Sequence, residues 1–335
     1  MDIIKVGQAI SYLRKRAGYT QKELADRIGI SDKAVSKWER GQGLPEIGYL
    51  RKLSILLDTD SDSLLTGNVF HHDNGWQGIL ILDDNENDIG AGTIIFDKPL
   101  IYFLLSYYML VGIRTINIIC GENNRNWIER NLGDGSAYGV QIHCCNSLST
   151  IDPEDAQNMM IIHGRCVLYG VEQTRFFLRA MAEKDRLSVL ALPQKSRPIH
   201  VDSKLRILDA NKPKALRKQY DYSKLPVFFM PASYFSGLSS ASSVTTFLDN
   251  HEVFVEMMDR GFIEIEINDW NDVQDASLLM KIIQDKCGMN VYCLEEVAWR
   301  RGLISLEQLK KLGERNNRTE YGAYVLSIYE RMRTK

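Results

Sequence analysis

The chain has 335 residues, a length typical of two or three domains rather than of one small module. Apolar residues make up 44% of it and charged residues 25%, and this ordinary globular composition excludes a wholly disordered or fibrous chain. The 41 Lys and Arg and the 43 Asp and Glu nearly cancel, so any surface that attracts nucleic acid must be local.

The sequence carries no pattern of a membrane or disulfide-bonded protein. No apolar run approaches the roughly 18 residues that a bilayer-spanning helix needs, and residues 1–7 lack the order of a signal peptide. The six cysteines include no CxxC pair and have no histidine at zinc spacing. We therefore expect a soluble, cytoplasmic protein with reduced thiols and no metal site.

Charge is distributed unevenly along the chain. Residues 1–57 carry eleven Lys and Arg against six Asp and Glu, whereas the rest carries 30 against 37. We call residues 1–66 the head and residues 76–335 the body. A basic head on an acidic body predicts that any contact with DNA is made by the head.

The head shows the apolar periodicity of short amphipathic helices. The first helix has one apolar stripe: Val6, Ile10, Leu13 and Ala17. Gly18 ends this helix. Thr20 and Glu23 have the spacing of a capping box and predict a second helix over residues 21–28. Its expected inward residues are Leu24, Ala25 and Ile28.

The third helix is the one expected to face a partner. Gly29 permits a tight turn, and Ser31 caps a helix over residues 32–40. Its inward residues are Val35 and Trp38, beside the small Ala34, and its outward residues are Asp32, Lys33, Ser36, Lys37 and Arg40. Gly41 ends this helix, and Pro45 begins a fourth. The fourth helix has Leu50, Leu53 and Leu57 inside.

Two short helices joined by a glycine turn, the second with polar side chains outward, predict helix-turn-helix geometry. The run TQKELADRIGISDKAVSKWERG at residues 20–41 resembles the Cro/cI-type (XRE) family of bacterial DNA-binding domains, and the match covers nearly all of residues 4–66. The resemblance implies phosphate contacts for Gln21, Ser31 and Arg40, and contacts with base edges for Asp32, Lys33, Ser36 and Lys37. Lysine can donate to guanine acceptors, and aspartate can accept from the cytosine amine. The alternatives are a helical bundle with a solvated charged face and a domain of this type that contacts proteins.

One such head covers only one half-site, and a single module binds weakly, so we expect a dimer or tetramer. Residues 67–75 are polar and without periodicity, which predicts a linker. His71 and His72 lie in this linker with no further ligand nearby, so they predict no metal site.

After the linker, apolar runs alternate with helical patterns. Strands are expected over residues 78–82, 115–119, 140–143, 159–163 and 187–192, and helices over residues 98–111, 125–132 and 172–181. This alternation predicts an α/β domain over residues 76–290, with a mixed, mainly parallel sheet and helices on both faces.

Five segments of the body resemble sugar-1-phosphate nucleotidylyltransferases, most closely the glucose-1-phosphate thymidylyltransferases. They are residues 96–102 (FDKPLIY), 109–114 (MLVGIR), 131–140 (NLGDGSAYGV), 288–302 (GMNVYCLEEVAWRRG) and 320–324 (EYGAY). They follow the family's order and span most of residues 76–333. The resemblance implies the family's fold. It also implies a C-terminal helical segment at residues 291–335, with helices over residues 294–332, that makes oligomer contacts.

The family's chemistry needs Mg²⁺ and cationic side chains around the phosphates. The family supplies a glycine-rich loop ending in Gly-Thr-Arg, a lysine further along and two metal-binding aspartates. At the loop position, residues 83–96 carry four carboxylates and no Lys or Arg. The GAGT at residues 90–93 is an isolated GxGT that no arginine follows. Because carboxylates repel a triphosphate, this segment predicts a shortened acidic surface loop.

The sequence also differs from the family at the metal-binding and base-reading positions. Arg165, in a Gly-Arg-Cys run, stands where the family has the first metal aspartate, and arginine cannot ligate Mg²⁺. Glu266 aligns with the second metal position, and residues 147–157 lack the family's base-reading motif. Lys212 aligns with the lysine that meets the sugar phosphate and could hold an anion; the alternative is an ordinary surface lysine.

Losing several charge partners that act together predicts a body that kept the fold and lost the reaction, with no catalytic residues and no cofactor. We therefore expect a transcription regulator that binds double-stranded DNA and a second copy of itself, with a nucleotide sugar or sugar phosphate as a possible ligand. The alternative is an active, Mg²⁺-dependent sugar nucleotidyltransferase with an appended DNA-binding head. A third hypothesis is an assembly protein that docks on a pathway enzyme.

Overall fold

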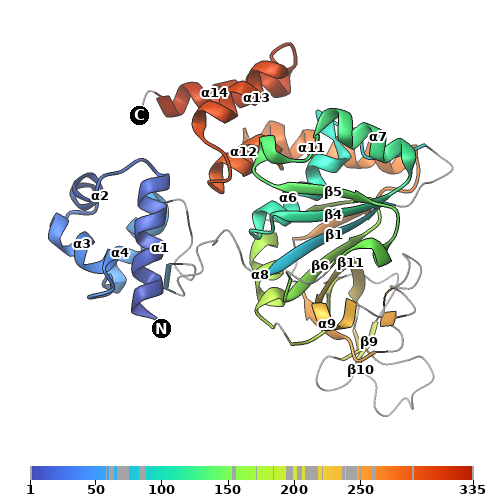
Figure 1. The fold of residues 1–335 in the computed structure, drawn as a ribbon, viewed down its shortest axis with the longest axis horizontal. Helices are drawn as coiled ribbons and strands as arrows, with labels where there is room; N and C mark the ends of the chain where they lie inside the picture. The colour runs from blue at the N-terminus through green and yellow to red at the C-terminus, as the bar shows by residue number, and fades with distance from the viewer. Residues whose placement is uncertain are drawn as a thin grey trace. The chain divides into compact units, whose positions relative to one another are not determined.

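The computed structural model describes residues 2–57, 59, 64–65, 75–82, 88–152, 156–170, 172–183, 185–193, 199–201, 206–207, 218–220, 222–235, 238, 247–248, 251–258, 261–288 and 290–333. The chain divides into two compact units, residues 1–71 and 72–335. The first contains the head and the second the body (Figure 1). Among the described residues, no helix combines the length and the apolar character that a membrane crossing requires.

The head contains four helices: α1 (Ile3–Arg16), α2 (Gln21–Ile28), α3 (Asp32–Glu39) and α4 (Ile47–Leu56). The predicted capping box of α2 is present, with the Glu23 N–H donating to Thr20 Oγ1 at 3.1 Å and the Thr20 N–H donating to Glu23 Oε2 at 2.7 Å. Gly29 has a φ of 87°, the left-handed conformation that the turn between α2 and α3 requires. The prediction that Pro45 begins the fourth helix is wrong by two residues, because the backbone is still extended at Glu46.

The predicted inward residues of the head form its core. Ten of them pack in one buried cluster: Val6, Ile10, Leu13, Leu24, Ala25, Ile28, Val35, Trp38, Leu53 and Leu57. Leu50 is buried as well, outside this cluster. Ala17 was expected in the stripe of α1 but is exposed, because it caps the end of the helix. Gly7 explains how closely α1 and α3 approach, since a Cβ atom there would lie 2.2 Å from the carbonyl oxygen of Trp38.

The body is built on a seven-stranded sheet of order β12-β8-β11-β6-β1-β4-β5, part of which can be followed in Figure 1. The strands are β1 (Trp76–Leu82), β4 (Thr115–Cys120), β5 (Gln141–Cys145), β6 (Asn158–His163), β8 (Ser188–Pro193), β11 (Tyr222–Pro231) and β12 (Phe254–Met257). β1 pairs in parallel with β4 and β6, β4 with β5, and β12 with β8, whereas β11 is antiparallel to both of its neighbours. The predicted mixed, mainly parallel sheet is confirmed.

Alternate residues of the strands feed two separate cores, as the pleat of a sheet requires. Leu80 and Leu82 pack with the core formed by most of the helices of the body, whereas Ile79 and Ile81 pack with the core on the opposite face. The helices of the first core are α6 (Leu100–Leu110), α7 (Glu122–Asn131), α8 (Gln173–Ala182), α11 (Trp270–Cys287), α12 (Leu294–Arg300), α13 (Leu306–Arg315) and α14 (Glu320–Arg333). The second core takes in the short helix α9 (Ala232–Phe235) and the 3-10 turn η2 (Leu148–Thr150).

Short strand pairs complete the body. β2 (Ile94–Ile95) pairs with β3 (Lys98–Pro99), β7 (Cys166–Tyr169) with β13 (Ile263–Glu266), and β9 (Ile199–Val201) with β10 (Lys218–Tyr220). The prediction of a helix from residue 98 is therefore wrong at its first two residues, which form β3. Pro99 caps the start of α6 instead.

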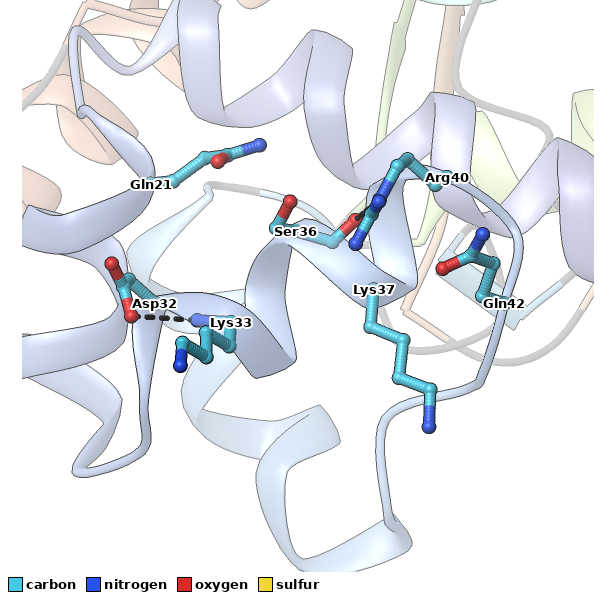
Figure 2. A pocket seen from close by; sticks show the side chains of 7 residues that line it. All are labelled: Gln21, Asp32, Lys33, Ser36, Lys37, Arg40 and Gln42. Atoms are coloured by element: carbon cyan, nitrogen blue, oxygen red, sulfur yellow. Dashed lines mark hydrogen bonds between the residues drawn. The ribbon is translucent and has the colours of Figure 1, made fainter.

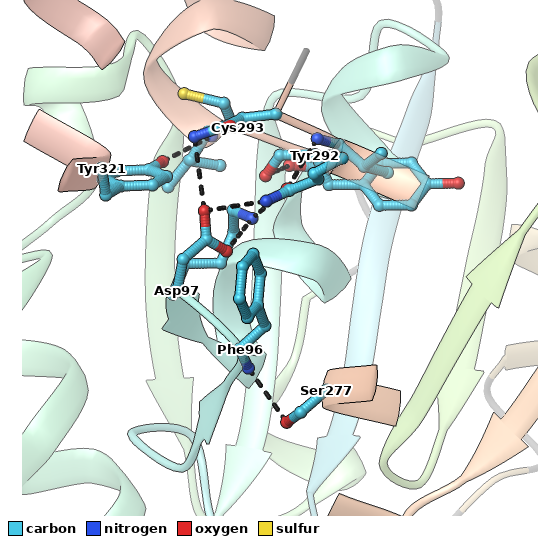
Figure 3. A network of polar contacts seen from close by, with 12 residues as sticks. Phe96, Asp97, Ser277, Tyr292, Cys293 and Tyr321 are labelled. Carbon is cyan, nitrogen blue, oxygen red and sulfur yellow. Dashed lines mark hydrogen bonds and ion pairs between the residues drawn. The ribbon is translucent and has the colours of Figure 1, made fainter. Parts of the chain in front are cut away.

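A buried polar network joins β3 to α11 and to the segment before α12 (Figure 3). The Lys98 ammonium is 1% exposed; it forms an ion pair with Asp97 and donates to Gln284 Oε1 at 3.0 Å. Burial lowers the pKa of Lys98, and the charge of Asp97 opposes this effect. Gln284 also accepts from the N–H of Val291 at 2.9 Å. These bonds fix the inner side of α11 against the rest of the body.

Candidate functional site

A polar hollow of about 510 Å³ lies on the surface of the head (Figure 2). The residues that line it come from α2, α3 and the turn after α3: Gln21, Asp32, Lys33, Ser36, Lys37, Arg40 and Gln42. The structure thus brings together six of the seven residues that sequence analysis assigned to DNA contacts. The seventh, Ser31, caps α3 and is exposed but does not line the hollow. Gln42 also lines the hollow but was not predicted, because it follows Gly41 outside the helical pattern.

The outward face of α3 carries more positive than negative charge. Lys33, Lys37 and Arg40 are exposed, and Figure 2 shows the two lysine side chains extending from the helix. Asp32 accepts a hydrogen bond from the Lys33 N–H at 2.7 Å, and Arg40 Nε donates to the carbonyl of Ser36 at 3.2 Å. This face therefore offers several donors and one carboxylate acceptor within two turns of one helix.

A buried ion pair supports this face from behind. Arg14 donates to Glu39 through Nε at 2.5 Å and through Nη2 at 2.9 Å, and the Gln21 amide nitrogen donates to Glu39 Oε2 at 2.7 Å. Burial raises the pKa of the Glu39 carboxyl, but the hydrogen bonds from Arg14 and Gln21 outweigh it, so the pKa lies below its ordinary value. The network links α1, α2 and α3 and holds Gln21 at the hollow.

The two positions that the resemblance relates to metal binding lie next to each other in the body. β7 and β13 pair with Glu266 opposite Cys166. Arg165 is joined to Ile267 in both directions: its carbonyl accepts from the Ile267 N–H at 2.8 Å, and its Nε donates to the Ile267 carbonyl at 3.3 Å. An arginine thus stands beside the exposed Glu266. Among the described residues, no three His, Cys, Asp or Glu side chains are grouped to hold a metal. Arginine cannot ligate Mg²⁺, so of these two positions only Glu266 offers a ligand.

The GxGT loop is packed against α7. The Gly90 N–H donates to Thr93 Oγ1 at 2.9 Å, and the Ala91 N–H donates to Asn124 Oδ1 at 2.7 Å. A Cβ atom at Gly92 would lie 2.2 Å from Trp127 Nε1. The glycines are therefore explained by close packing, and two of the amides that a phosphate-binding loop would offer to phosphates are bonded within the protein.

Three of the sequence assignments lie outside the described residues, one of them being the predicted linker up to residue 74 with His71 and His72. Lys212 and the acidic residues 83–87 belong to segments that the structure does not describe. Of the predicted ligand-binding pair, only Glu266 is therefore placed, at the end of β13.

Comparison with known proteins relates the head and the body to different proteins. The family model described as helix-turn-helix matches residues 10–64. The body is similar to glucose-1-phosphate thymidylyltransferases. That of Neisseria meningitidis serogroup A is 26% identical over 262 residues, covering 71% of this chain and 91% of that protein. That of Xanthomonas campestris pv. campestris is 26% identical over 261 residues, covering 71% and 88%.

Among solved structures, the inositol-1-phosphate CTP transferase from T. maritima aligns with a TM-score of 0.46 and 13% identity, covering 63% of this chain and 98% of that one. The chain carries a helix-turn-helix domain of the XRE type at residues 10–64. The rest of the chain is a body like that of the glucose-1-phosphate thymidylyltransferases.

Proposed function

We propose that the protein is a sequence-specific DNA-binding transcription regulator. The observation that carries the proposal is the outward face of α3, on which Lys33, Lys37 and Arg40 surround one hollow within a helix-turn-helix domain. A helix of this kind fits the major groove, and its exposed donors match base and phosphate acceptors there. Because DNA lies in the cytoplasm of a bacterial cell, we place such a regulator there.

The resemblance to the Cro/cI-type family implies how the contacts divide. Asp32, Lys33, Ser36 and Lys37 are assigned to base edges, and Gln21, Ser31 and Arg40 to phosphates. Gln42 joins this interface from the turn after α3. Phosphate contacts position the helix, whereas contacts with base edges supply the specificity.

The test begins with the full chain and a library of random DNA duplexes, from which an enriched sequence is expected. On that sequence, Lys37→Ala is expected to weaken specific binding by about 1–3 kcal/mol and to change nonspecific binding less. Lys15→Ala is the matched control, since it removes the same charge from an exposed position of α1 outside the hollow. If no sequence is enriched, the proposal fails; if the ratio of specific to nonspecific affinity is unchanged in Lys37→Ala, Lys37 reads no base.

We further propose that the body does not transfer nucleotides. Support comes from the Gly90 and Ala91 amides, which are bonded to Thr93 and Asn124. It comes also from Arg165, which the resemblance aligns with the family's first metal-binding aspartate. With dTTP, glucose 1-phosphate and Mg²⁺, we expect no pyrophosphate release above a protein-free blank. Release at an enzymatic rate would overturn this proposal and establish the alternative, an active nucleotidyltransferase with a DNA-binding head, which the likeness to the thymidylyltransferases favours.

The body is assigned two further roles. It brings two heads together through self-association, for which the C-terminal segment at residues 291–335 is one candidate surface. It also senses a nucleotide sugar or sugar phosphate through Lys212 and Glu266. Flat calorimetry traces with dTDP-glucose, UDP-sugars and glucose 1-phosphate would reject the sensing role.

A further inference from the structure

The outer side of α11 carries an apolar stripe that nothing in the described chain covers. Trp270, Leu278 and Ile282 are 55%, 57% and 50% exposed. The opposite side of the helix is held firmly, because Ser277 Oγ accepts from the Phe96 N–H at 3.0 Å and Gln284 is bonded to Lys98. Isolated exposed apolar side chains are ordinary, but Leu278 and Ile282 lie one turn apart on one face of a fixed helix, with Trp270 two turns before Leu278. Together they offer apolar surface to a partner.

The C-terminal helices offer no comparable surface. In the described parts of α12, α13 and α14, no large apolar side chain is exposed, and Tyr321, Val325, Ile328 and Tyr329 are all buried. Within the described body, the apolar surface suited to self-association is therefore centred on α11.

The charged residues of α11 indicate which partner would cover this apolar surface. Asp269, Asp272 and Asp275 lie in the first part of the helix and its cap. Lys281, Asp285 and Lys286 lie in the last part, which keeps a net positive charge although Lys281 pairs with Asp285 at 3.1 Å. A second copy of α11 laid antiparallel would place each acidic part against a basic part and would also pair the two helix dipoles favourably. We propose that the outer face of α11 is the contact through which two copies of this chain associate, with a two-fold axis at Leu278.

The position of the axis follows from the same charges. With the axis at Leu278, Lys281 lies opposite Asp275 of the partner subunit, and Lys286 lies opposite the partner's Trp270, an arrangement suited to a cation–π contact. With the axis midway between Leu278 and Ile282, Asp275 would instead meet the partner's Asp285. Like charges face each other there, so the first register is favoured.

The choice of a second copy as occupant rests on the proposed function, since one head covers only one half-site. The decisive test uses two single charge reversals in the full chain, Asp275→Lys and Lys281→Glu. Each alone sets like charges across the axis twice, and we expect the dissociation constant of its homodimer to rise roughly tenfold. An equimolar mixture restores both attractive pairs, so sedimentation should show a heterodimer that forms nearly as tightly as the wild-type dimer. If the mixture behaves as its components do, the antiparallel contact is wrong.

The apolar stripe is tested by Leu278→Glu combined with Ile282→Glu, which should be monomeric at concentrations where the wild type is a dimer. Ile47→Glu is the control, because Ile47 is 87% exposed in the head. A wild type that is monomeric, or a double variant that remains a dimer, overturns this inference. Neither result contradicts the proposed function as a DNA-binding regulator, provided that an enriched DNA sequence is found. A dimer that the variants break, but that binds no DNA sequence, would instead refute the proposed function and support the contact.

Discussion

Glu39→Gln should loosen the head more than any other single loss of charge on it. Glu39 accepts three hydrogen bonds from Arg14 and Gln21, and the side chains of the ion pair are 9% and 6% exposed. Removing one partner of a buried pair costs about 3–5 kcal/mol, because the other charge stays buried. Glutamine keeps one carbonyl acceptor, so we expect a loss of about 3 kcal/mol, a large fraction of the roughly 5–15 kcal/mol by which a domain is stable.

Hydrogen exchange resolved by peptide measures this loss in the full chain without separating the two units. Three kcal/mol corresponds to about 150-fold faster exchange of the amides of α1, α2 and α3 that open with the head. Glu46→Gln is the matched control, because Glu46 is exposed and its side chain makes no capping hydrogen bond. If the two variants exchange within about threefold of each other, the Arg14–Glu39 pair does not stabilise the head as argued.

Four further outcomes follow from single sites. The pKa of Glu39 is lowered from 4.5, so the ionised carboxylate stabilises the head above that pH, and this stabilisation is lost as the pH falls through the folded pKa. The difference in melting temperature between wild type and Glu39→Gln should therefore shrink below about pH 4.5. Gly92→Ala should destabilise the body by about 1–3 kcal/mol in urea unfolding, since its Cβ atom would lie 2.2 Å from Trp127 Nε1. Gly48→Ala should instead stabilise the head by about 0.5–1 kcal/mol, because Gly48 lies in helix α4 and its Cβ atom would have no neighbour within 4 Å. Thr20→Ala should cost the head about 1 kcal/mol by thermal melting, and a neutral result would contradict the capping box.

The head was predictable because its determinants are local. Thr20 and Ser31 cap helices that begin one residue later, and the left-handed glycines Gly18, Gly29 and Gly41 end or separate them. Each of these features depends on a few consecutive residues. The helical period predicts which residues of α3 face outward, whereas their roles toward DNA, and the role of Gln21, come from the resemblance to the Cro/cI-type family. Gln42 depends on the path of the turn that follows.

The body was predictable only where strands and helices alternate regularly. β11 escaped prediction because Pro226 interrupts its apolar run, and proline cannot donate to a neighbouring strand. The structure accommodates it where the register of β11 against β8 shifts, between Lys224 and Phe228. The packing of Gly92 on Trp127 also joins residues far apart in the sequence, so no local pattern could have predicted it.

The described segments that resemble the thymidylyltransferases mostly stabilise the fold of the body. Asp97 and Lys98 of the FDKP segment hold Gln284 of α11, and Lys98 is 1% exposed. In the segment around residues 288–302, Glu295 is fully buried, and burial raises the pKa of its carboxyl. Tyr321 of the EYGAY segment donates to this carboxyl. Substitution of such groups would leave a buried polar partner unpaired, so a chain that needs the fold retains them whether or not it transfers nucleotides. Likeness carried by these residues therefore predicts the fold of the body more securely than it predicts turnover.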